Sequence, residues 1–298
     1  MDKPAGVSSH DVVAVARRSI GESRVGHAGT LDPFATGLLL LLSGRATRLM
    51  RFVRDEPKVY EATVRFGSET DTEDLHGTVV REGPLPSSAS LFAAAPRFVG
   101  ETDQVPPAYS AKHVDGKRSY ELARAGHAVP LPAVRITVHA LSLDRFAGSD
   151  DAVEQCGLRV SCAGGTYVRS LARDLGRAVG SAAHLVALRR MEAGSFLASR
   201  AVTLEALQAG RAVLEPPLAA LAGYPEQALT TDELRKVVRG IDVEARVDGA
   251  FAALVDADVY GGAGTLVAFA QRRSSEQGDR WQPRVVMRDP AAGDSNRP

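Results

Sequence analysis

The chain has 298 residues, of which 44% are hydrophobic, so it is long enough to bury one large core or two smaller ones. Its 36 lysines and arginines balance 36 aspartates and glutamates, and this net charge of zero excludes a protein that is basic overall, so any nucleic-acid-binding surface must be local. The longest aliphatic run, residues 38–42, is too short to cross a bilayer, and the N-terminus lacks a signal-peptide pattern, so we expect a cytoplasmic globular protein.

The two cysteines, Cys156 and Cys162, have neither metal-ligand nor redox-motif spacing. We expect both to be reduced core or strand residues, and we predict no zinc and no disulfide.

A helix is the first predicted element. Ser8 or Ser9 can cap it, apolar residues recur as far as Ile20, and Gly21 is suited to end it. It leads into residues 24–37, RVGHAGTLDPFATG, where three glycines and Pro33 predict a shaped loop.

Asp32 is the candidate nucleophile of this loop, because a carboxylate presented on a rigid turn can attack an electrophile. The alternative is structural, since an Asp before a Pro commonly bonds its own backbone in a turn. His27 is the other group in the loop that titrates near neutrality, and a lone loop histidine is usually solvated.

Residues 38–42 predict a buried strand that would support Asp32 from behind. In the helix expected from 44 to 54, arginines recur at every third position, and no acidic residue occurs between 33 and 54. This pattern fits either a solvated amphipathic helix or a face that contacts phosphates.

Residues 58–66 alternate cleanly and predict a strand that carries Tyr60 on its buried face. The following loop, 70–76, crowds three carboxylates and a histidine together, but its spacing matches neither an EF-hand nor a zinc helix.

Residues 105–132 interleave aromatic and cationic side chains and turn at Asp115-Gly116. Rings that stack on bases and charges that hold phosphates suit RNA, although a plain hairpin followed by a short helix explains the same residues.

Two further strands are expected at 134–146 and 157–162. Residues 164–171, GGTYVRSL, then predict a glycine-shaped entry into a helix that ends near Gly176 or Gly180, and Leu188 is expected in the core.

A small β-rich domain is predicted beyond the prolines near 220, from a helix at 232–239 and strands near 251–255 and 266–270. We also expect a hairpin turn at 261–264 and a disordered tail after Arg288.

Several blocks resemble, in the same order, the TruB family of bacterial tRNA pseudouridine synthases. Residues 26–37 match the family's Gly-His-x-Gly-x-Leu-Asp-Pro-x-Ala-x-Gly, and residues 165–169 match its Gly-Thr-Tyr-x-Arg. Residues 2–6 and 70–77 resemble its Asp-Lys-Pro-x-Gly and Thr-Asp-Thr-x-Asp-x-x-Gly elements. An apolar strand precedes the first of these in the family, whereas almost nothing precedes it here.

The resemblance implies an α+β fold, with a mixed, mainly antiparallel sheet flanked by helices. The expected catalytic domain is 1–222, including an RNA-gripping insertion at 105–132, followed by a small domain at 223–290, for which the family suggests a PUA-type barrel, and a tail at 291–298. The implied activity is isomerisation of uridine 55 in the T-loop of tRNA by a monomer, without cofactor, metal or protein partner.

The resemblance also assigns roles. Asp32 would be the catalytic carboxylate, with Arg169 favouring its ionised form. Tyr60 would stack on the target base and Tyr167 would contact the uracil. Leu171 and Leu188 would line the pocket, His27 would fill the gap left by the flipped base, and Lys3 would contact RNA phosphate or support the loop; these are the expected substrate-binding residues.

Two other functions remain open on the same scaffold. One is a non-catalytic RNA-binding or tRNA-folding module, against which the combination of Asp32, Tyr60 and Arg169 argues. The other is a guide-RNA-dependent synthase of the dyskerin type.

Overall fold

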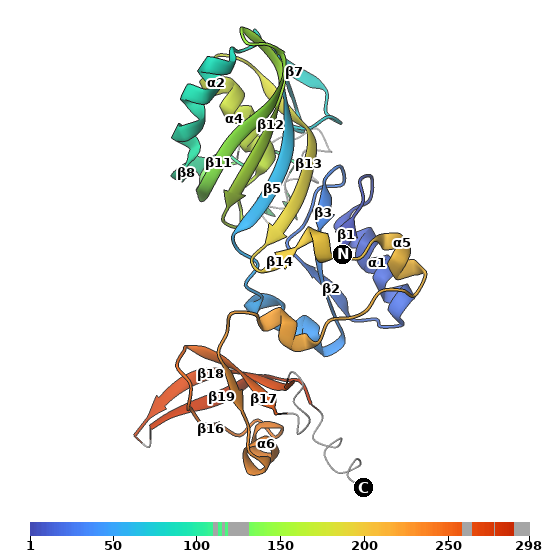
Figure 1. The fold of residues 1–298 in the computed structure, drawn as a ribbon, viewed down its shortest axis with the longest axis vertical. Coiled ribbons are helices and arrows are strands. Elements are labelled where there is room, and N and C mark those ends of the chain that lie inside the picture. Colours follow the sequence, from blue (N-terminus) through green and yellow to red (C-terminus); the bar gives the residue numbers. More distant parts are fainter. Residues whose placement is uncertain (110–112, 115–116, 119–130, 258–263, 277, 289–298) are drawn as a thin grey trace. The chain divides into compact units, whose positions relative to one another are not determined.

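The computed structural model describes residues 1–109, 113–114, 117–118, 131–257, 264–276 and 278–288 (Figure 1). The chain forms two compact units, each assembled from separate segments. The first unit contains residues 1–9, 31–39 and 55–203, and the second contains 10–30, 40–54 and 204–298. The expected domain boundary near residue 222 stays a prediction.

The first unit is built on an eight-stranded sheet with the order β1-β3-β13-β5-β12-β11-β8, in which β14 also pairs with β13. Its strands are β1 (Asp2–Lys3), β3 (Thr36–Leu38), β5 (Lys58–Phe66), β8 (Gly100–Gln104), β11 (Val134–Ser149), β12 (Ala152–Cys162), β13 (Ala183–Ala193) and β14 (Phe196–Leu197). Only the β13–β3 pairing among these is parallel. The prediction of a mixed, mainly antiparallel sheet is confirmed.

Strand β5 lies in the middle of this sheet, and its bounds agree with the predicted strand. Tyr60, Ala62, Val64 and Phe66 are all buried, as the alternation indicates. The neighbouring β12 buries Cys156 and Cys162, which are free cysteines in the core, as expected. Burial raises the pKa of these two thiols to about 12 and about 11.

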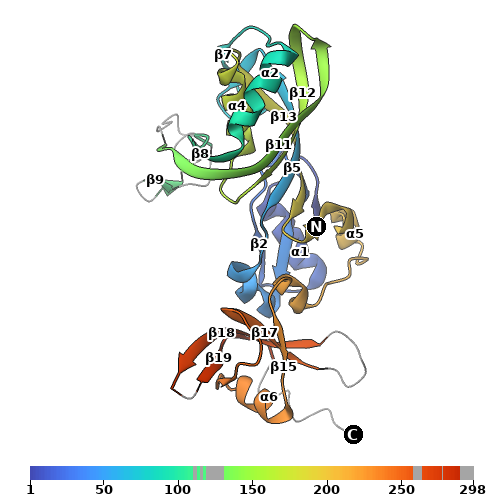
Figure 2. The same ribbon diagram turned by 60° about the vertical axis from the view of Figure 1, so that its left-hand side comes forward.

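Helices α2 (Ser88–Ala94) and α4 (Val168–Ala178) cover one face of this sheet (Figures 1 and 2). Short 3₁₀ helices follow at η2 (Ala95–Phe98) and η3 (Ala198–Arg200), and β6 (Ser68–Thr70) pairs with β7 (Val79–Glu82). Strands β9 (His113–Val114) and β10 (Lys117–Arg118) form the predicted hairpin. Its turn residues and the helix expected after it lie outside the described residues.

The second unit begins with α1 (Ser9–Ile20), whose first residue belongs to the first unit. Its end at Ile20 is the predicted one, and Gly21 follows with a φ of 65°. Strand β2 (Val25–Ala28) pairs with β4 (Leu40–Ser43). The single strand expected at 38–42 is therefore wrong: β3 and β4 are separate strands in separate sheets, with Leu39 between them.

The C-terminal part of this unit contains the predicted small β-rich structure. Its five-stranded sheet has the order β15-β17-β18-β19-β16. The elements are α5 (Leu204–Gln208), η4 (Pro217–Leu221), β15 (Glu226–Ala228), α6 (Thr231–Val237), β16 (Val243–Glu244), β17 (Phe251–Asp256), β18 (Thr265–Ser275) and β19 (Gly278–Val286). The predicted turn at 261–264 lies largely outside the described residues, as does the tail from 289.

The arginine-rich segment forms a 3₁₀ helix, η1 (Gly44–Phe52), in which three-residue spacing aligns side chains on one face. That face is not simply solvated. Arg45 and Arg48 donate to the carbonyls of Met287 and Val286, at 3.1 and 3.2 Å. These two arginines therefore help to hold η1 against the end of the C-terminal sheet.

No helix in the described ranges has both the length and the apolar character needed to cross a membrane.

Candidate active site

The Asp32 loop is fixed by hydrogen bonds within the first unit. Ser9 Oγ accepts from the Leu31 amide at 2.9 Å and donates to the Leu31 carbonyl at 3.0 Å. The Asp32 carbonyl accepts from the Ala35 amide at 3.1 Å, which closes a turn across Pro33. The backbone on both sides of the Asp32 carboxylate is thereby held in place.

Lys3 supports the same loop from inside the protein. Its side chain is fully buried, and Nζ donates to the carbonyls of Pro4, Val7 and Pro33 at 2.9, 2.7 and 3.1 Å. A buried ammonium engaged in this way is neither a solvated terminal lysine nor placed to meet a phosphate. Its geometry matches the loop-supporting alternative.

Arg169 is the second residue of α4, and only 4% of its side chain is exposed. Its Nε donates to Asp32 Oδ2 at 2.8 Å and its Nη2 to Asp32 Oδ1 at 3.1 Å. This two-point contact fixes the carboxylate plane against the guanidinium plane. Because the Asp32 side chain is 35% exposed, its carboxylate remains accessible to a substrate.

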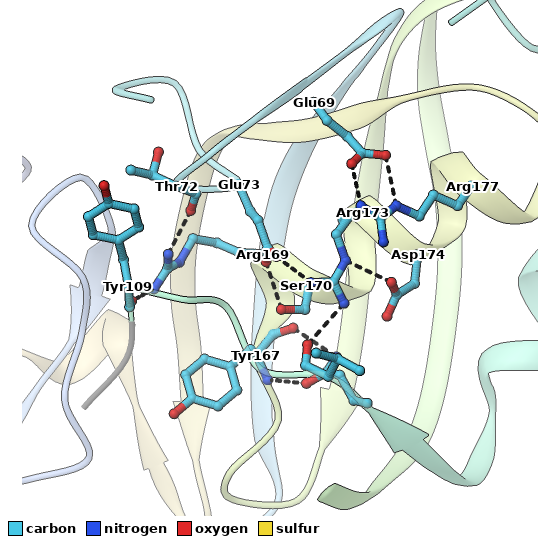
Figure 3. Close-up of polar contacts among 12 residues, drawn as sticks. Glu69, Thr72, Glu73, Tyr109, Tyr167, Arg169, Ser170, Arg173, Asp174 and Arg177 are labelled. Atoms are coloured by element: carbon cyan, nitrogen blue, oxygen red, sulfur yellow. Dashed lines mark hydrogen bonds and ion pairs between the residues drawn. The ribbon is translucent and has the colours of Figure 1, made fainter. Parts of the chain in front are cut away.

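Two backbone carbonyls hold the rest of this guanidinium. Nη1 donates to the Thr72 carbonyl at 2.7 Å, and Nη2 also donates to the Tyr109 carbonyl at 3.0 Å (Figure 3). Arg169 is thus held by two backbone carbonyls in addition to its contact with Asp32.

Tyr167 lies two residues before Arg169, at the N-terminus of α4. Its amide donates to Gln104 Oε1 at 2.9 Å, and its carbonyl accepts from Gln104 Nε2 at 3.1 Å. Gln104 is 2% exposed, and its side-chain amide bonds both the amide and the carbonyl of Tyr167, as the backbone of a neighbouring strand would. The backbone beside the half-buried Tyr167 ring is therefore rigid.

Tyr60 lies on β5 opposite Arg190 of β13, and its ring is 8% exposed. Burial raises the pKa of the Tyr60 hydroxyl, which the Arg190 guanidinium opposes by charge and by a hydrogen bond, while the charge of Asp32 adds slightly to the rise. At neutral pH this hydroxyl stays protonated. Arg190 is 1% exposed and donates from Nε to the Leu38 carbonyl at 2.7 Å.

The apolar residues of the expected pocket are both buried. Leu188 is 7% exposed and lies opposite Ala62 of β5, and Leu171 is 1% exposed in the first turns of α4. His27 lies in β2, opposite Leu41 of β4, in the second unit. The first unit thus brings Asp32 and Arg169 into direct contact, and it carries Lys3, Tyr60, Tyr167 and both leucines.

The acidic loop at 70–76 uses its carboxylates within the protein. Asp74 Oδ1 accepts from Thr72 Oγ1 at 2.7 Å and from the His76 amide at 3.0 Å. Glu73 contacts Arg173 and Ser170 of α4. Among the residues that the structure describes, no group of three His, Cys, Asp or Glu side chains is arranged to hold a metal ion.

Sequence reasoning missed several residues that lie around this site, namely Arg190, Gln104, Thr72, Glu73 and Arg173. Arg173 had a usable signal, because Arg169, Arg173 and Arg177 recur every four residues along α4. Gln104 had none, since only the fold brings the end of β8 to the start of α4.

Comparison with known proteins identifies the family of this chain. Residues 17–168 match the TruB family pseudouridylate synthase N-terminal domain, and residues 169–243 match the tRNA pseudouridylate synthase B C-terminal domain. The tRNA pseudouridine synthase B of Thermobifida fusca is 41% identical over 292 residues, which cover 96% of this chain and 97% of that protein. The protein of the same name from Azoarcus sp. is 44% identical over 84% of this chain and 83% of its own length.

Solved structures share the fold. An H/ACA RNP bound to a substrate RNA containing 2'-deoxyuridine has a chain with a TM-score of 0.70 at 20% identity, covering 97% of this chain and 84% of that one. A Cbf5-Nop10-Gar1 complex gives 0.69 at 22% identity over the same shares. The family matches and the identity to full-length relatives establish that this chain belongs to the TruB family of pseudouridine synthases.

Proposed function

We propose that this chain converts uridine 55 in the T-loop of tRNA to pseudouridine, with Asp32 as the catalytic carboxylate. It belongs to a pseudouridine synthase family, and its relatives named tRNA pseudouridine synthase B match almost its whole length. The observation that carries the assignment of Asp32 is its two-point contact with buried Arg169. The guanidinium orients a partly exposed carboxylate and balances its charge.

The reaction breaks the bond from C1′ of the ribose to N1 of uracil and forms a bond from C1′ to C5. The C5 proton is lost and N1 gains one, so the step is an isomerisation without net oxidation. A carboxylate can promote it by attacking the sugar, by attacking the base or by removing a sugar proton. All three routes need a correctly placed carboxylate, and the two-point contact with Arg169 fixes the orientation of Asp32.

The target base must leave the folded loop to reach Asp32, at a cost of about a few kcal/mol. In this proposal, stacking on Tyr60 returns roughly 1 to 3 kcal/mol, Leu171 and Leu188 line an apolar pocket, and Tyr167 contacts the uracil. His27 and the insertion at 105–132 bind the surrounding tRNA. Lys3 acts indirectly, by holding the Pro33 carbonyl beneath the Asp32 loop.

We further propose that the chain acts in the cytoplasm as a monomer, on the T-stem-loop, without guide RNA or protein partner. The test is tritium release from an unmodified tRNA transcript labelled at C5 of uridine, using the purified chain alone. Release with pseudouridine at position 55 is expected. Activity only with an added guide RNA would favour the dyskerin-type alternative, and tRNA binding without any release would favour a non-catalytic module.

A further inference from the structure

Three arginines lie one turn apart along one face of α4, and each contacts a carboxylate. Figure 3 shows Arg173 and Arg177 with Glu73 and Glu69. Arg169 contacts Asp32, Arg173 contacts Glu73 and Arg177 contacts Glu69. The middle pair is the most enclosed, because the side chains of Arg173 and Glu73 are each 9% exposed. A buried ion pair is poor evidence of a contribution to stability, so the position of this one needs another explanation.

Glu73 sits in a backbone conformation that is unfavourable for its residue type. Its φ is 61°, in the left-handed region that glycine or asparagine normally occupies. Its amide donates to the Thr70 carbonyl at 3.0 Å, and its carbonyl accepts from the Leu185 amide at 3.1 Å. The turn that carries Glu73 is therefore anchored to the sheet on one side.

The Glu73 side chain anchors the same turn to α4. Its Oε2 accepts from Ser170 Oγ at 2.7 Å, and its Oε1 accepts from Arg173 Nη1. Arg173 is fixed in turn, since Nε donates to Asp174 at 2.8 Å and Nη2 to the Val105 carbonyl at 2.9 Å. Ser170 directly follows Arg169, so Glu73 is held one residue from the proposed catalytic pair.

The residue before Glu73 is Thr72, whose carbonyl accepts from Arg169 Nη1 at 2.7 Å. These contacts close a ring from the Arg169 guanidinium through Thr72 and Glu73 to Ser170 and Arg173, and back along α4 to Arg169 (Figure 3). Moving the turn would move the Thr72 carbonyl, and Arg169 would lose an acceptor that sets the plane of its guanidinium.

We propose that Glu73 and Arg173 are positioning residues for the reaction, acting through the Thr72 carbonyl and Arg169 to hold Asp32 in its reactive orientation. This inference rests on the proposed function of Asp32. It assigns to the buried pair a task in catalysis rather than in stability, and it explains why a glutamate occupies a left-handed position.

The test compares Glu73→Asn with Glu69→Asn in the full chain. Asparagine tolerates the left-handed backbone at position 73 but is too short to keep both contacts of the glutamate. Glu69 is the matched control, because it is also buried and also bonds an α4 arginine. Its carboxylate accepts from Arg177 Nε and Nη2 at 2.9 and 2.6 Å and from Arg81 Nη1 at 2.6 Å. Single-turnover rates, tRNA affinity and melting temperature are measured for each.

We expect Glu73→Asn to lower the rate of the chemical step by about 10- to 100-fold while tRNA affinity changes by less than about twofold. Glu69→Asn should keep the wild-type rate even if its melting temperature falls. In an Arg169→Lys background, Glu73→Asn should lower the rate little further, because Glu73 acts through the Arg169 guanidinium that this background already lacks. If Glu73→Asn does not fold, Ser170→Ala takes its place in the test. It removes a single hydrogen bond to Glu73 and should also lower the rate.

A wild-type rate for Glu73→Asn, an equal loss for Glu69→Asn, or an undiminished effect in the Arg169→Lys background would each overturn this inference alone. An inactive wild-type chain, or a fully active Asp32→Asn variant, would instead overturn the proposed function, and this inference with it.

Discussion

The Asp32 carboxylate accepts two hydrogen bonds from the Arg169 guanidinium, from Nε at 2.8 Å and from Nη2 at 3.1 Å, although 137 residues separate them in the chain. The arginine is buried and bonded to two backbone carbonyls, whereas the aspartate is partly exposed. One partner is therefore structural in character and the other is accessible. This asymmetry is what a site needs if it is to present a fixed carboxylate to a substrate.

Replacing Arg169 should affect orientation more than charge. Arg169→Lys keeps a cation but cannot make the two-point contact, so we expect turnover to fall by about 100-fold with little change in tRNA affinity. Arg169→Ala should lose more, because it also leaves Asp32 without its partner. Single-turnover pseudouridine formation measures both effects, and a wild-type rate for either variant would remove Arg169 from the site.

Tyr60 should act through its ring rather than as a base, since its hydroxyl stays protonated at neutral pH. Tyr60→Ala should therefore abolish turnover, whereas Tyr60→Phe, which keeps the ring, should retain more of it. The Phe variant also takes an acceptor from buried Arg190, which should lower the unfolding free energy by about 1 to 3 kcal/mol. Equal losses of turnover in the two variants would contradict a stacking role.

Lys3→Met separates loop support from phosphate contact. It keeps an apolar stem and removes the ammonium that bonds the Pro33 carbonyl. Turnover should fall while tRNA affinity and the dependence of binding on salt stay unchanged. A residue that contacts phosphate would behave oppositely, because losing it would reduce the slope of log affinity against log salt concentration by about one.

The second unit offers a pH-dependent test of stability. Glu233 caps α6 with Thr230, and hydrogen bonds from Arg246 lower the pKa of Glu233 to about 2. A lowered carboxyl pKa stabilises the folded state above the unfolded pKa of about 4.3, and this contribution disappears as pH falls towards 2. At pH 7, Glu233→Gln should lower the free energy of unfolding by about 0.5 to 1.5 kcal/mol, because solvent screening limits the effect.

Trp281, the single tryptophan, is fully buried beside Gln227 in this unit. Its fluorescence during urea unfolding therefore measures the free energy of unfolding of each variant. The difference between Glu233→Gln and wild type should shrink as pH falls below 4. Asp232→Asn is the control, since Asp232 is 82% exposed and should contribute almost nothing. A constant difference from pH 7 to pH 3 would contradict the assigned cause.

Local patterns predicted most elements whose residues interact with near neighbours. The alternation along 58–66 gives β5, and the glycines before Thr166 lead into α4, as expected. The sequence could not show that residues 38–42 divide between two sheets, because that depends on which strands pair with them. The arginines of η1 also looked available to phosphate, and only the folded chain reveals the carbonyls that two of them bond.

The candidate site divides in the same way. Asp32, Tyr60, Tyr167 and Arg169 were named because their blocks match a family pattern, although their roles remain predictions. Glu73 and Arg173 were not paired, because 100 residues separate the two partners. Charges so far apart in the chain can be paired only once α4 lies beside the turn at 70–74.

The most direct test of the central claim is pseudouridine formation at position 55 by Asp32→Asn, which has nearly the shape of the wild-type side chain but lacks its charge. Asp103→Asn is the matched control, since Asp103 pairs with Arg135 on the surface of the sheet. We predict that Asp32→Asn binds tRNA nearly normally and forms no pseudouridine, while Asp103→Asn behaves as wild type. Substantial turnover by Asp32→Asn would contradict the assignment of Asp32 as the catalytic carboxylate.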